Sequence, residues 1–203
     1  MFGDPSANPL KWDCCVLDDV IHAAQDGPHV SPKYAQSGVP FLSTRHIKQG
    51  RVIWDDLKFL SGAEANTQWR KCRPEKGDVL YTKGGTTGIA AAVTFDRPFA
   101  VWVHIAVLKT DHAKVDPVWL ESMLNCNFCY RQSQELTHGI ANRDLGLTRM
   151  VKIKMYLPPL TLQKVFADRV KEIRELESKQ TTSRVRLDDL FQSMLHRAFS
   201  GDL

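Results

Sequence analysis

The sequence has no long hydrophobic run. None of its windows approaches the roughly 20 consecutive apolar residues that a membrane-spanning helix needs, and the opening segment, MFGDPSANPLKW, lacks the apolar centre of a secretory signal peptide. The chain has only five cysteines, an odd number, which without such a signal favours reduced thiols over a disulfide framework. We therefore expect a cytoplasmic protein with no structural disulfide and no membrane contact.

A strong charge imbalance is also absent. The 203 residues include 27 Lys and Arg against 23 Asp and Glu, which gives a formal net charge of +4. This excess permits an anionic partner such as DNA but does not demand one. Hydrophobic residues make up 43% of the chain and charged residues 25%, so it can bury enough apolar surface for one folded domain, alone or with an extension.

Proline is missing from residues 161–203, which contain one glycine, whereas residues 1–160 are rich in both. An alternating stretch at residues 151–157 predicts a strand and runs into Pro158 and Pro159, which oppose helix just before them. Thr161 then suits the N-cap of a helix. The sequence therefore predicts a domain at residues 1–160 and a helical region at residues 161–203.

Apolar residues in the helical region recur at steps of three and four, which is the spacing of one helix face. Gln180 and Ser183 interrupt this face, so two folded-back helices are the alternative to one long helix. Because no Gly or Pro accompanies them, we favour one helix of about 57 Å. Such a length predicts an antiparallel coiled coil between chains. Its expected contact residues are Phe166, Ile173, Leu176, Leu187, Leu190 and Met194.

Residues 1–160 show no regular alternation of strand and helix patterns, which argues against a Rossmann-type sheet. Short apolar runs between turn residues predict a β-rich, largely antiparallel α+β domain. Asp116 and Pro117 suit a helix start. Strands are predicted at residues 39–42, 78–82, 89–95 and 101–108, and short helices at residues 17–24 and 117–124.

A glycine-rich loop, KGGTTG, follows the strand predicted at residues 78–82. Its backbone N–H groups and the ammonium of Lys83 could hold a phosphate. The loop lacks the Gly-Lys-Ser/Thr ending of a nucleotide-binding P-loop, which argues against NTP binding. A plain hairpin turn explains the same residues equally well, so the loop alone decides nothing.

Cys126 and Cys129, with His138 downstream, are the best candidates for zinc ligands. A tetrahedral site needs a second pair of ligands at suitable spacing, which the sequence does not supply. Both cysteines fit the end of a helix as small apolar side chains. We predict no metal.

Patterns typical of catalysis are lacking as well. Glu75, Lys76 and Asp78 resemble a nuclease site only loosely, because their spacing does not give a metal-binding pair followed by a strand lysine. No serine stands in the context of a nucleophile elbow. We expect no catalytic residues in this chain.

Several stretches together resemble the specificity subunits of type I restriction-modification systems, over nearly the whole chain. The most specific part is a Pro-Pro-Leu-x-x-Gln stretch that precedes a long helical pattern, which ends in Arg-Ala-Phe-x-Gly-Asp-Leu. The stretches are VPFL and RHI within residues 39–47, GDVL at residues 77–80 with Gly84 and Gly88, IKMYLPPL and Gln163 within residues 153–163, and LFQSMLHRAFSGDL at residues 190–203.

The resemblance implies a target recognition domain that reads one part of a bipartite DNA site, and a helix that sets the distance to a second such domain. Family subunits usually carry two of each. This chain is therefore expected to be a half-length subunit, which pairs with a second copy or another half-subunit, or a fragment of a longer one. A homodimer would read an interrupted palindrome.

The resemblance also implies recognition without chemistry. The methyltransferase (M) and restriction (R) subunits would supply catalysis, and S-adenosylmethionine, ATP and magnesium would belong to them, leaving no cofactor in this chain. Basic loops with glutamines and asparagines among them suit contact with double-stranded DNA, and an ordinary solvated surface is the alternative. The loops that face DNA in the family place the expected contacts at Arg45, Lys48, Lys83, Thr86, Thr87, His138 and Arg143.

Two other functions stay open at this point. One is a target domain from another DNA methyltransferase or nuclease, whose catalytic part would lie elsewhere. The other is a coiled-coil assembly protein whose basic surface is incidental, and it predicts no salt-dependent binding to DNA.

Overall fold

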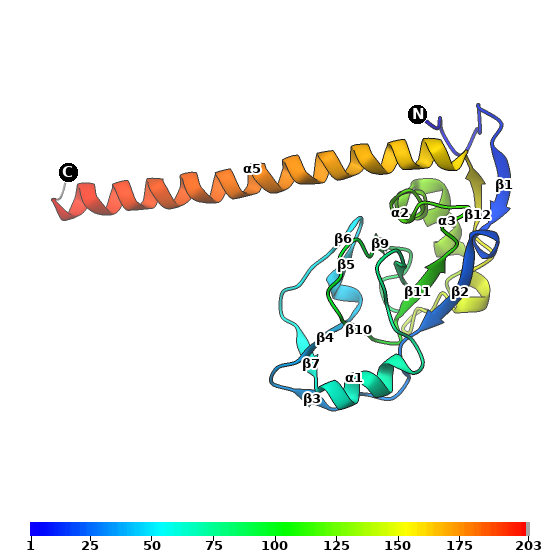
Figure 1. Cartoon of the computed structure of the whole chain (residues 1–203), viewed down its shortest axis with the longest axis horizontal. Helices are drawn as coiled ribbons and strands as arrows, with labels where there is room; N and C mark the ends of the chain where they lie inside the picture. Colours follow the sequence, from blue (N-terminus) through cyan, green and yellow to red (C-terminus); the bar gives the residue numbers. More distant parts are fainter. Residues whose placement is uncertain (202–203) are drawn as a thin grey trace. The chain divides into compact units, whose positions relative to one another are not determined.

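The computed structural model describes residues 1–201 and has an α+β fold, in which short strands and helices precede one long C-terminal helix (Figure 1). The chain divides into two compact units. The first is Met1–Lys164, and the second begins at Val165 inside the long helix. The predicted fold class, a β-rich domain with a long C-terminal helix, is confirmed.

One four-stranded sheet has the order β2-β11-β8-β9 and is antiparallel throughout. Every residue of β8 and β9 is buried, which explains their uninterrupted sequences VLYT and AAA. The strand bounds are Ile21–Asp26 for β2, Ile105–Thr110 for β11, Val79–Thr82 for β8 and Ala90–Ala92 for β9.

Strand β9 forms one edge of this sheet, and helix α2 (Pro117–Asn125) closes it. The Asn125 side chain bonds both the N–H and the carbonyl of Ala90, at 2.9 Å each. A carboxylate oxygen of Glu121 accepts from the Ala92 N–H at 2.7 Å. Because unpaired backbone groups at a buried edge are costly, these contacts hold α2 against the sheet.

The second four-stranded sheet has the order β10-β4-β7-β3, with β10 parallel to β4 and the other pairs antiparallel. Two short ladders accompany it, β1 with β12 and β5 with β6. The bounds are Ala100–Val101 for β10, Val39–Leu42 for β4, Lys58–Leu60 for β7, Tyr34–Ala35 for β3, Asp13–Val16 for β1, Lys154–Leu157 for β12, Ile47–Lys48 for β5 and Arg51–Val52 for β6.

Short helical segments connect the strands. Side-chain caps explain two of their starts: the Ser61 hydroxyl accepts from the Glu64 N–H at 3.2 Å, and the Asp116 carboxylate accepts from the Val118 N–H at 2.8 Å. The other bounds are Leu17–Val20 for η1, Thr44–His46 for η2, Gly62–Trp69 for α1, Asn127–Glu135 for α3 and Leu147–Met150 for α4.

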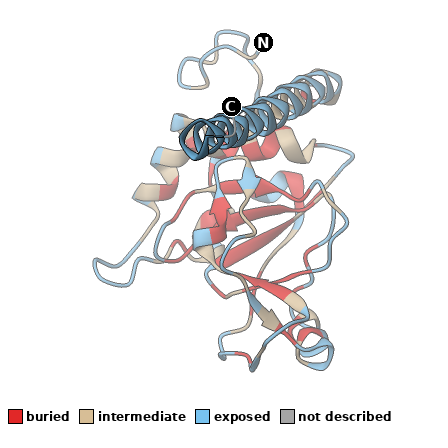
Figure 2. Cartoon of the chain, turned by 90° about the vertical axis from the view of Figure 1, so that its left-hand side faces the viewer, coloured by how far each residue is buried: buried red, intermediate tan, exposed pale blue. Residues whose placement is uncertain are grey.

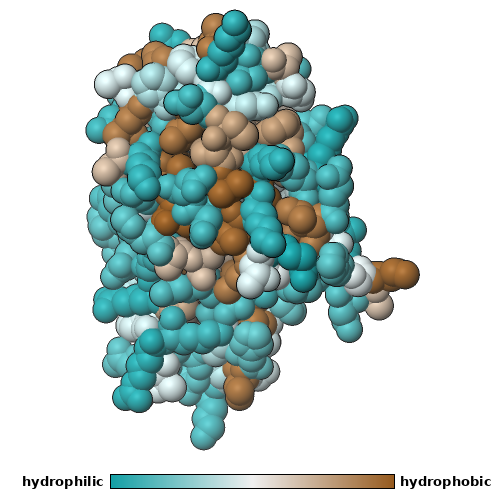
Figure 3. All heavy atoms as spheres, turned by 90° about the vertical axis from the view of Figure 1, so that its right-hand side faces the viewer, coloured by the Kyte–Doolittle hydropathy of each residue, from teal (hydrophilic) through white to brown (hydrophobic). Residues whose placement is uncertain are grey.

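The main core cluster joins the two four-stranded sheets. Leu42 of β4, Leu80 of β8 and Ile105 of β11 belong to it and are fully buried. Figure 2 shows that buried residues concentrate in the strands of the first unit, and on the face in Figure 3 hydrophilic side chains break up the hydrophobic groups. Each large apolar side chain in such a core contributes about 1.5–3 kcal/mol through burial.

The strands predicted at residues 89–95 and 151–157 are shorter in the structure, as β9 (Ala90–Ala92) and β12 (Lys154–Leu157). Two further predicted elements differ in kind or in continuity. Residues 17–24 do not form a helix: a single 3-10 turn is followed by strand β2, which pairs with β11. Residues 101–108 do not form one strand, because the chain leaves β10 in one sheet, turns at Trp102, and enters the other sheet as β11. The Ile105 N–H donates to the Trp102 carbonyl at 2.9 Å in this turn. The predictions at residues 39–42 and 117–124 are confirmed.

Helix α5 is unbroken over the 41 residues Leu160–Ser200, so the alternative of two folded-back helices is wrong. At 1.5 Å per residue it is about 60 Å long. Gln180 and Ser183 lie inside it and do not interrupt its backbone. No helix within residues 1–201 combines the length and hydropathy needed to cross a membrane.

The predicted N-cap of α5 at Thr161 is wrong. The helix has already begun at Leu160, and the Pro159 carbonyl accepts from the N–H groups of Leu162 and Gln163 at 2.9 and 3.2 Å. Proline suits this position because it needs no hydrogen bond from its own nitrogen.

Candidate nucleic-acid interface

Three of the residues expected to contact DNA line one open groove of about 750 Å³, here called the basic groove. Arg45 comes from η2, Lys48 from β5 and Thr86 from the glycine-rich loop. Within the described residues its charged lining consists of three cations and no carboxylate, since Arg51 joins Arg45 and Lys48. The full lining is Thr44, Arg45, Ile47, Lys48, Gln49, Arg51, Ile53, Thr86 and Ile89.

A tight hairpin positions two of these cations. Strands β5 and β6 place Lys48 directly opposite Arg51. Gly50 occupies the turn with φ +74°, a conformation that glycine adopts without strain, and its N–H donates to the Ala90 carbonyl at 3.0 Å. The hairpin tip is thereby tied to β9. Arg51 was not among the expected contacts, and the hairpin spacing of Lys48 and Arg51 is the signal that could have found it.

His46 holds η2 in place beneath Arg45. Its ring is 3% exposed, and its Nδ1 accepts from the Ser43 N–H at 2.8 Å. Burial lowers the pKa of His46, and the adjacent Arg45 guanidinium lowers it further. The ring is therefore neutral near pH 7. Arg45 donates to the Asp56 carbonyl, which fixes its exposed guanidinium at the rim of the groove.

Lys83 is buried, at 6% exposure. Its Nζ lies 3.4 Å from an Asp26 carboxylate oxygen and 3.3 Å from one of Asp144. The pair of carboxylates ties the glycine-rich loop to β2 and to the loop that carries Asp144. A phosphate contact by Lys83 stays a prediction, but the geometry gives this ammonium two partners inside the protein.

Thr87 is also buried, at 2% exposure, and connects the glycine-rich loop to α3. The Gln134 side chain donates to the Thr87 carbonyl at 3.1 Å. Arg143 donates to the Thr87 hydroxyl at 3.4 Å and to the Gln134 side-chain carbonyl. A Cβ at Gly88, whose φ is +87°, would lie 2.2 Å from the Ser133 hydroxyl oxygen. Only glycine allows the loop to approach α3 this closely.

The loop at residues 138–145 runs beside the glycine-rich loop. His138 and Asp144 exchange two backbone hydrogen bonds, of 2.9 and 2.8 Å. The Gly85 N–H donates to the Arg143 carbonyl at 3.0 Å, and the Leu145 N–H donates to the Lys83 carbonyl at 2.7 Å. The side chains of His138 and Arg143 are exposed. Backbone bonds therefore hold them beside the loop whose tip, Thr86, lines the basic groove.

The structure thus brings the expected DNA contacts into two connected groups. Arg45, Lys48 and Thr86 are in the basic groove, while His138 and Arg143 are exposed on the neighbouring loop. Lys83 and Thr87 lie beneath the surface and join the loops together. We call the exposed residues of both groups the recognition surface.

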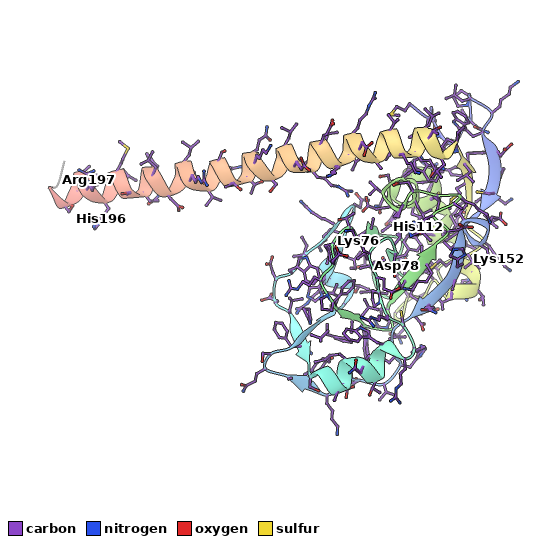
Figure 4. The ribbon with its side chains drawn as sticks, viewed as in Figure 1. Lys76, Asp78, His112, Lys152, His196 and Arg197 are labelled. Atoms are coloured by element: carbon purple, nitrogen blue, oxygen red, sulfur yellow. The ribbon has the colours of Figure 1, made fainter. Side chains whose placement is uncertain are left out.

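The residues that loosely resemble a nuclease site are engaged in structural contacts at the start of β8, where Figure 4 labels Lys76 and Asp78. The Asp78 carboxylate accepts from the Lys109 ammonium and from the Glu75 N–H, both at 2.7 Å. Burial raises the pKa of Asp78 above its ordinary value. Lys76 pairs with Asp96 at 2.8 Å. No catalytic role follows from this geometry.

Cys126 separates α2 from α3 and Cys129 is fully buried one turn later. The Cys129 thiol donates to the Cys126 sulfur and lowers the pKa of Cys126 to about 6. All five cysteines are free thiols. In the described part of the chain, no three His, Cys, Asp or Glu side chains are grouped so as to hold a metal ion.

Gln163, the glutamine of the Pro-Pro-Leu-x-x-Gln stretch, has a structural role that its place in the sequence did not predict. It is fully buried in the first turn of α5. Its side-chain carbonyl accepts from the Asp116 N–H at 2.9 Å, and its amide donates to the carbonyls of Pro158 at 2.8 Å and Lys114 at 3.3 Å. The start of α5 is therefore fixed to the start of α2.

Comparison with known proteins places this geometry in a family. The family model of the type I restriction modification DNA specificity domain matches residues 9–187. The type I restriction enzyme EcoBI specificity subunit of Escherichia coli is 22% identical over 211 residues, which cover 96% of this chain and 42% of that subunit.

Two solved structures share the fold. The S subunit of a type I restriction-modification system from M. genitalium has a TM-score of 0.58 at 13% identity and covers 83% of this chain and 40% of its own. The second structure comes from work on complex assembly and conformational transition of the type I R-M system. It has a TM-score of 0.57 at 19% identity, and the match covers 96% of this chain and 47% of that chain. The chain spans less than half the length of these relatives. Since the family model covers most of its residues, this chain belongs to the type I restriction-modification DNA specificity family.

Proposed function

We propose that this chain recognises one part of a bipartite DNA site within a type I restriction-modification complex and carries no catalytic site of its own. The match of a DNA specificity domain over residues 9–187 carries this proposal. The basic groove supports it, because its charged lining among residues 1–201 consists of three exposed cations and no carboxylate. Such a groove suits the phosphates of double-stranded DNA.

Within this proposal the lining residues of the basic groove and the exposed residues of the neighbouring loop have different contacts. Arg45, Lys48 and Arg51 contact phosphates, while Gln49 and Thr86 offer side chains that can hydrogen-bond to base edges. His138 and Arg143 extend the contact along the neighbouring loop. Lys83 and Thr87 act through the loops that they join, because their own side chains are buried.

The second part of the proposal concerns the C-terminal region, whose helix α5 spans Leu160–Ser200. Ile173, Leu176, Leu187, Leu190 and Met194 are each more than half exposed, and Phe166 is half-buried. An apolar seam at steps of three and four favours pairing with another helix. We infer an antiparallel coiled coil with a second copy of this chain or with another half-subunit, which would set the distance between two recognition domains.

In this proposal the catalytic steps are carried out by partner subunits. A methyltransferase subunit would bind S-adenosylmethionine, and a restriction subunit would use ATP and magnesium. One of the solved relatives comes from work on complex assembly of such a system, which supports an assembled rather than an isolated mode of action.

Equilibrium DNA binding over a salt series, with the methyltransferase subunit present, tests the proposal. Lys48→Ala should lower the slope of log K against log salt by about 1, because one phosphate contact is lost. Lys152→Ala is the matched control, since it removes an equally exposed charge outside the groove. Lys83→Met should weaken binding without changing the slope. Absence of duplex binding at low salt would overturn the proposal.

A further inference from the structure

A second hollow, of about 410 Å³, adjoins the basic groove, and Arg45 lines both. Its size lies within the roughly 300–1,000 Å³ that is usual for small-ligand pockets. We call it the aromatic pocket. It is lined by Tyr34, Phe41, Ser43, Arg45, His46, Lys58 and Trp102.

Strand register explains why three of these side chains meet. Lys58 of β7 lies opposite Phe41 of β4, and Leu60 of β7 lies opposite Tyr34 of β3. Opposed residues of an antiparallel pair share a face, and so do residues two apart in one strand. Tyr34, Phe41 and Lys58 therefore project from the same side of the sheet.

The aromatic rings form a wall with a covered base and an open rim. Phe41 is 4% exposed, and its ring centroid lies 5.9 Å from that of Tyr34 and 5.9 Å from that of Trp102. Tyr34 is 47% exposed. The Lys58 ammonium lies 4.3 Å from the centre of the Tyr34 ring. The half-exposed Tyr34 ring thus stands at the rim with the Lys58 ammonium over one of its faces.

The charges around the pocket have one sign. Arg45 and Lys58 are cations, and no carboxylate from the described part of the chain lines the pocket. Burial keeps His46 neutral by lowering its pKa. Flat aromatic faces beside cations complement a ligand that combines a planar ring with an anion. A nucleotide has both features.

We propose that the aromatic pocket accepts one nucleobase of the bound DNA, taken out of the helical stack. Tyr34 stacks on the base, and Arg45 and Lys58 bind the phosphates on either side of it. This inference rests on the proposed function, because the shared Arg45 joins the pocket to the groove that holds the duplex.

Photochemical crosslinking locates the stacked base. A randomised duplex pool with 5-iodouracil in place of thymine is selected for binding to the chain together with the methyltransferase subunit, irradiated and digested. We expect mass-spectrometric adducts on Tyr34 or Trp102, because this chromophore couples to aromatic rings stacked on it. Adducts confined to other residues of the chain would overturn the pocket proposal.

Affinity measurements on the selected duplex supply the second readout. Tyr34→Ala should weaken binding by about 5- to 150-fold, the loss typical for one stacked base, whereas Tyr34→Phe keeps the ring and should keep the affinity. A mismatch at the crosslinked position should tighten binding by the wild type, because unstacking then costs less, and should not tighten binding by Tyr34→Ala. Equal thermal stability of both variants excludes misfolding as the cause.

Two further measurements distinguish DNA from free nucleotides as the source of the base, and failure of the pocket proposal from failure of the proposed function. Deoxynucleoside monophosphates at millimolar concentration should not displace the duplex. If they do displace it, and the crosslinks that remain still fall on the pocket residues, the pocket is a site for free nucleotides and the assignment to DNA is overturned. If the wild type binds duplex and Tyr34→Ala binds equally well, the pocket proposal fails alone. If the wild type binds no duplex, the proposed function itself fails.

Discussion

The side-chain carbonyl of Gln163 accepts a hydrogen bond from the backbone N–H of Asp116 at 2.9 Å. Asp116 is also the N-cap of α2, where its carboxylate accepts from the N–H groups of Val118 and Trp119. One contact therefore links the first turns of two helices that are far apart in the sequence. Because Gln163 is fully buried, no water can take over its hydrogen bonds without a change in packing.

Replacement of Gln163 by leucine should lower the free energy of unfolding by about 1–3 kcal/mol, the usual cost of leaving buried hydrogen-bonding groups unpaired. The groups left unpaired would be the Asp116 N–H and the carbonyls of Lys114 and Pro158. Urea denaturation followed by circular dichroism measures the change. Gln192→Leu, at an exposed position of α5 away from its apolar seam, is the control and should change stability by less than about 0.5 kcal/mol. Equal effects at both positions would contradict the anchoring role of Gln163.

Local signals predicted elements whose causes are local. Asp116 and Pro117 set the start of α2, and the absence of Gly and Pro allowed an unbroken α5. The helix predicted at residues 17–24 was wrong because β2 forms a strand by pairing with β11, more than 80 residues away in the chain. The single strand predicted at residues 101–108 was wrong for a similar reason. Nothing in the local sequence shows that the chain passes from one sheet to the other at Trp102.

The stability of the fold should fall on acidification through His46. Burial holds the pKa of His46 below its ordinary value of 6.5, so the neutral ring is favoured in the folded state. Its contribution is complete above pH 6.5 and is lost as the pH falls from 6.5 toward the lowered pKa, with a slope of at most about 1.4 kcal/mol per pH unit. Thermal unfolding between pH 5 and pH 8 measures this slope.

His46→Gln is the matched variant for that measurement, because it retains a polar side chain that does not titrate. The unfolding temperature of the wild type should rise relative to that of His46→Gln as the pH rises from 5 to 7. A difference that does not vary with pH would show that His46 does not titrate differently in the two states.

The recognition surface was only partly accessible to sequence reasoning. Clusters of basic residues indicated Arg45 and Lys48 because such residues are exposed by default. The sequence could not distinguish them from Lys83, whose ammonium is buried between Asp26 and Asp144. Those carboxylates come from distant segments, so the pairing appears only once β2, β8 and the loop at residues 138–145 are assembled.

Alkylation should distinguish Cys126 from the other shielded thiols. The hydrogen bond from Cys129 lowers the pKa of Cys126 to about 6, while burial raises the pKa of Cys15 to about 11 and of Cys72 to about 12. Since the thiolate is the reactive form, iodoacetamide labelling of Cys126 should rise between pH 5 and pH 7 and then level off.

Peptide mapping by mass spectrometry follows each cysteine separately, which is needed because Cys14 is exposed. Cys129→Ala removes the donor beside the Cys126 sulfur and should move the labelling curve to higher pH. A Cys126 curve that begins to rise only above pH 8 in the wild type would contradict the lowered pKa.

Pairing through α5 should depend on its apolar seam. Leu190 is more than half exposed and lies on the same helix face as Leu187 and Met194. Leu190→Asp places a charge where a partner helix would exclude water, so it should raise the dissociation constant of the paired state by at least about tenfold. Sedimentation equilibrium over a concentration series measures that constant.

Gln192→Asp introduces the same carboxylate two residues away, on a different face of the helix, and should leave pairing unchanged. Loss of pairing in both variants would indicate a general effect of negative charge. A wild-type chain that stays monomeric at every concentration, alone and with the methyltransferase subunit, would exclude the coiled coil and leave the recognition surface without a second copy at a fixed distance. The site read by such a chain would then be a single contiguous sequence instead of two separated parts.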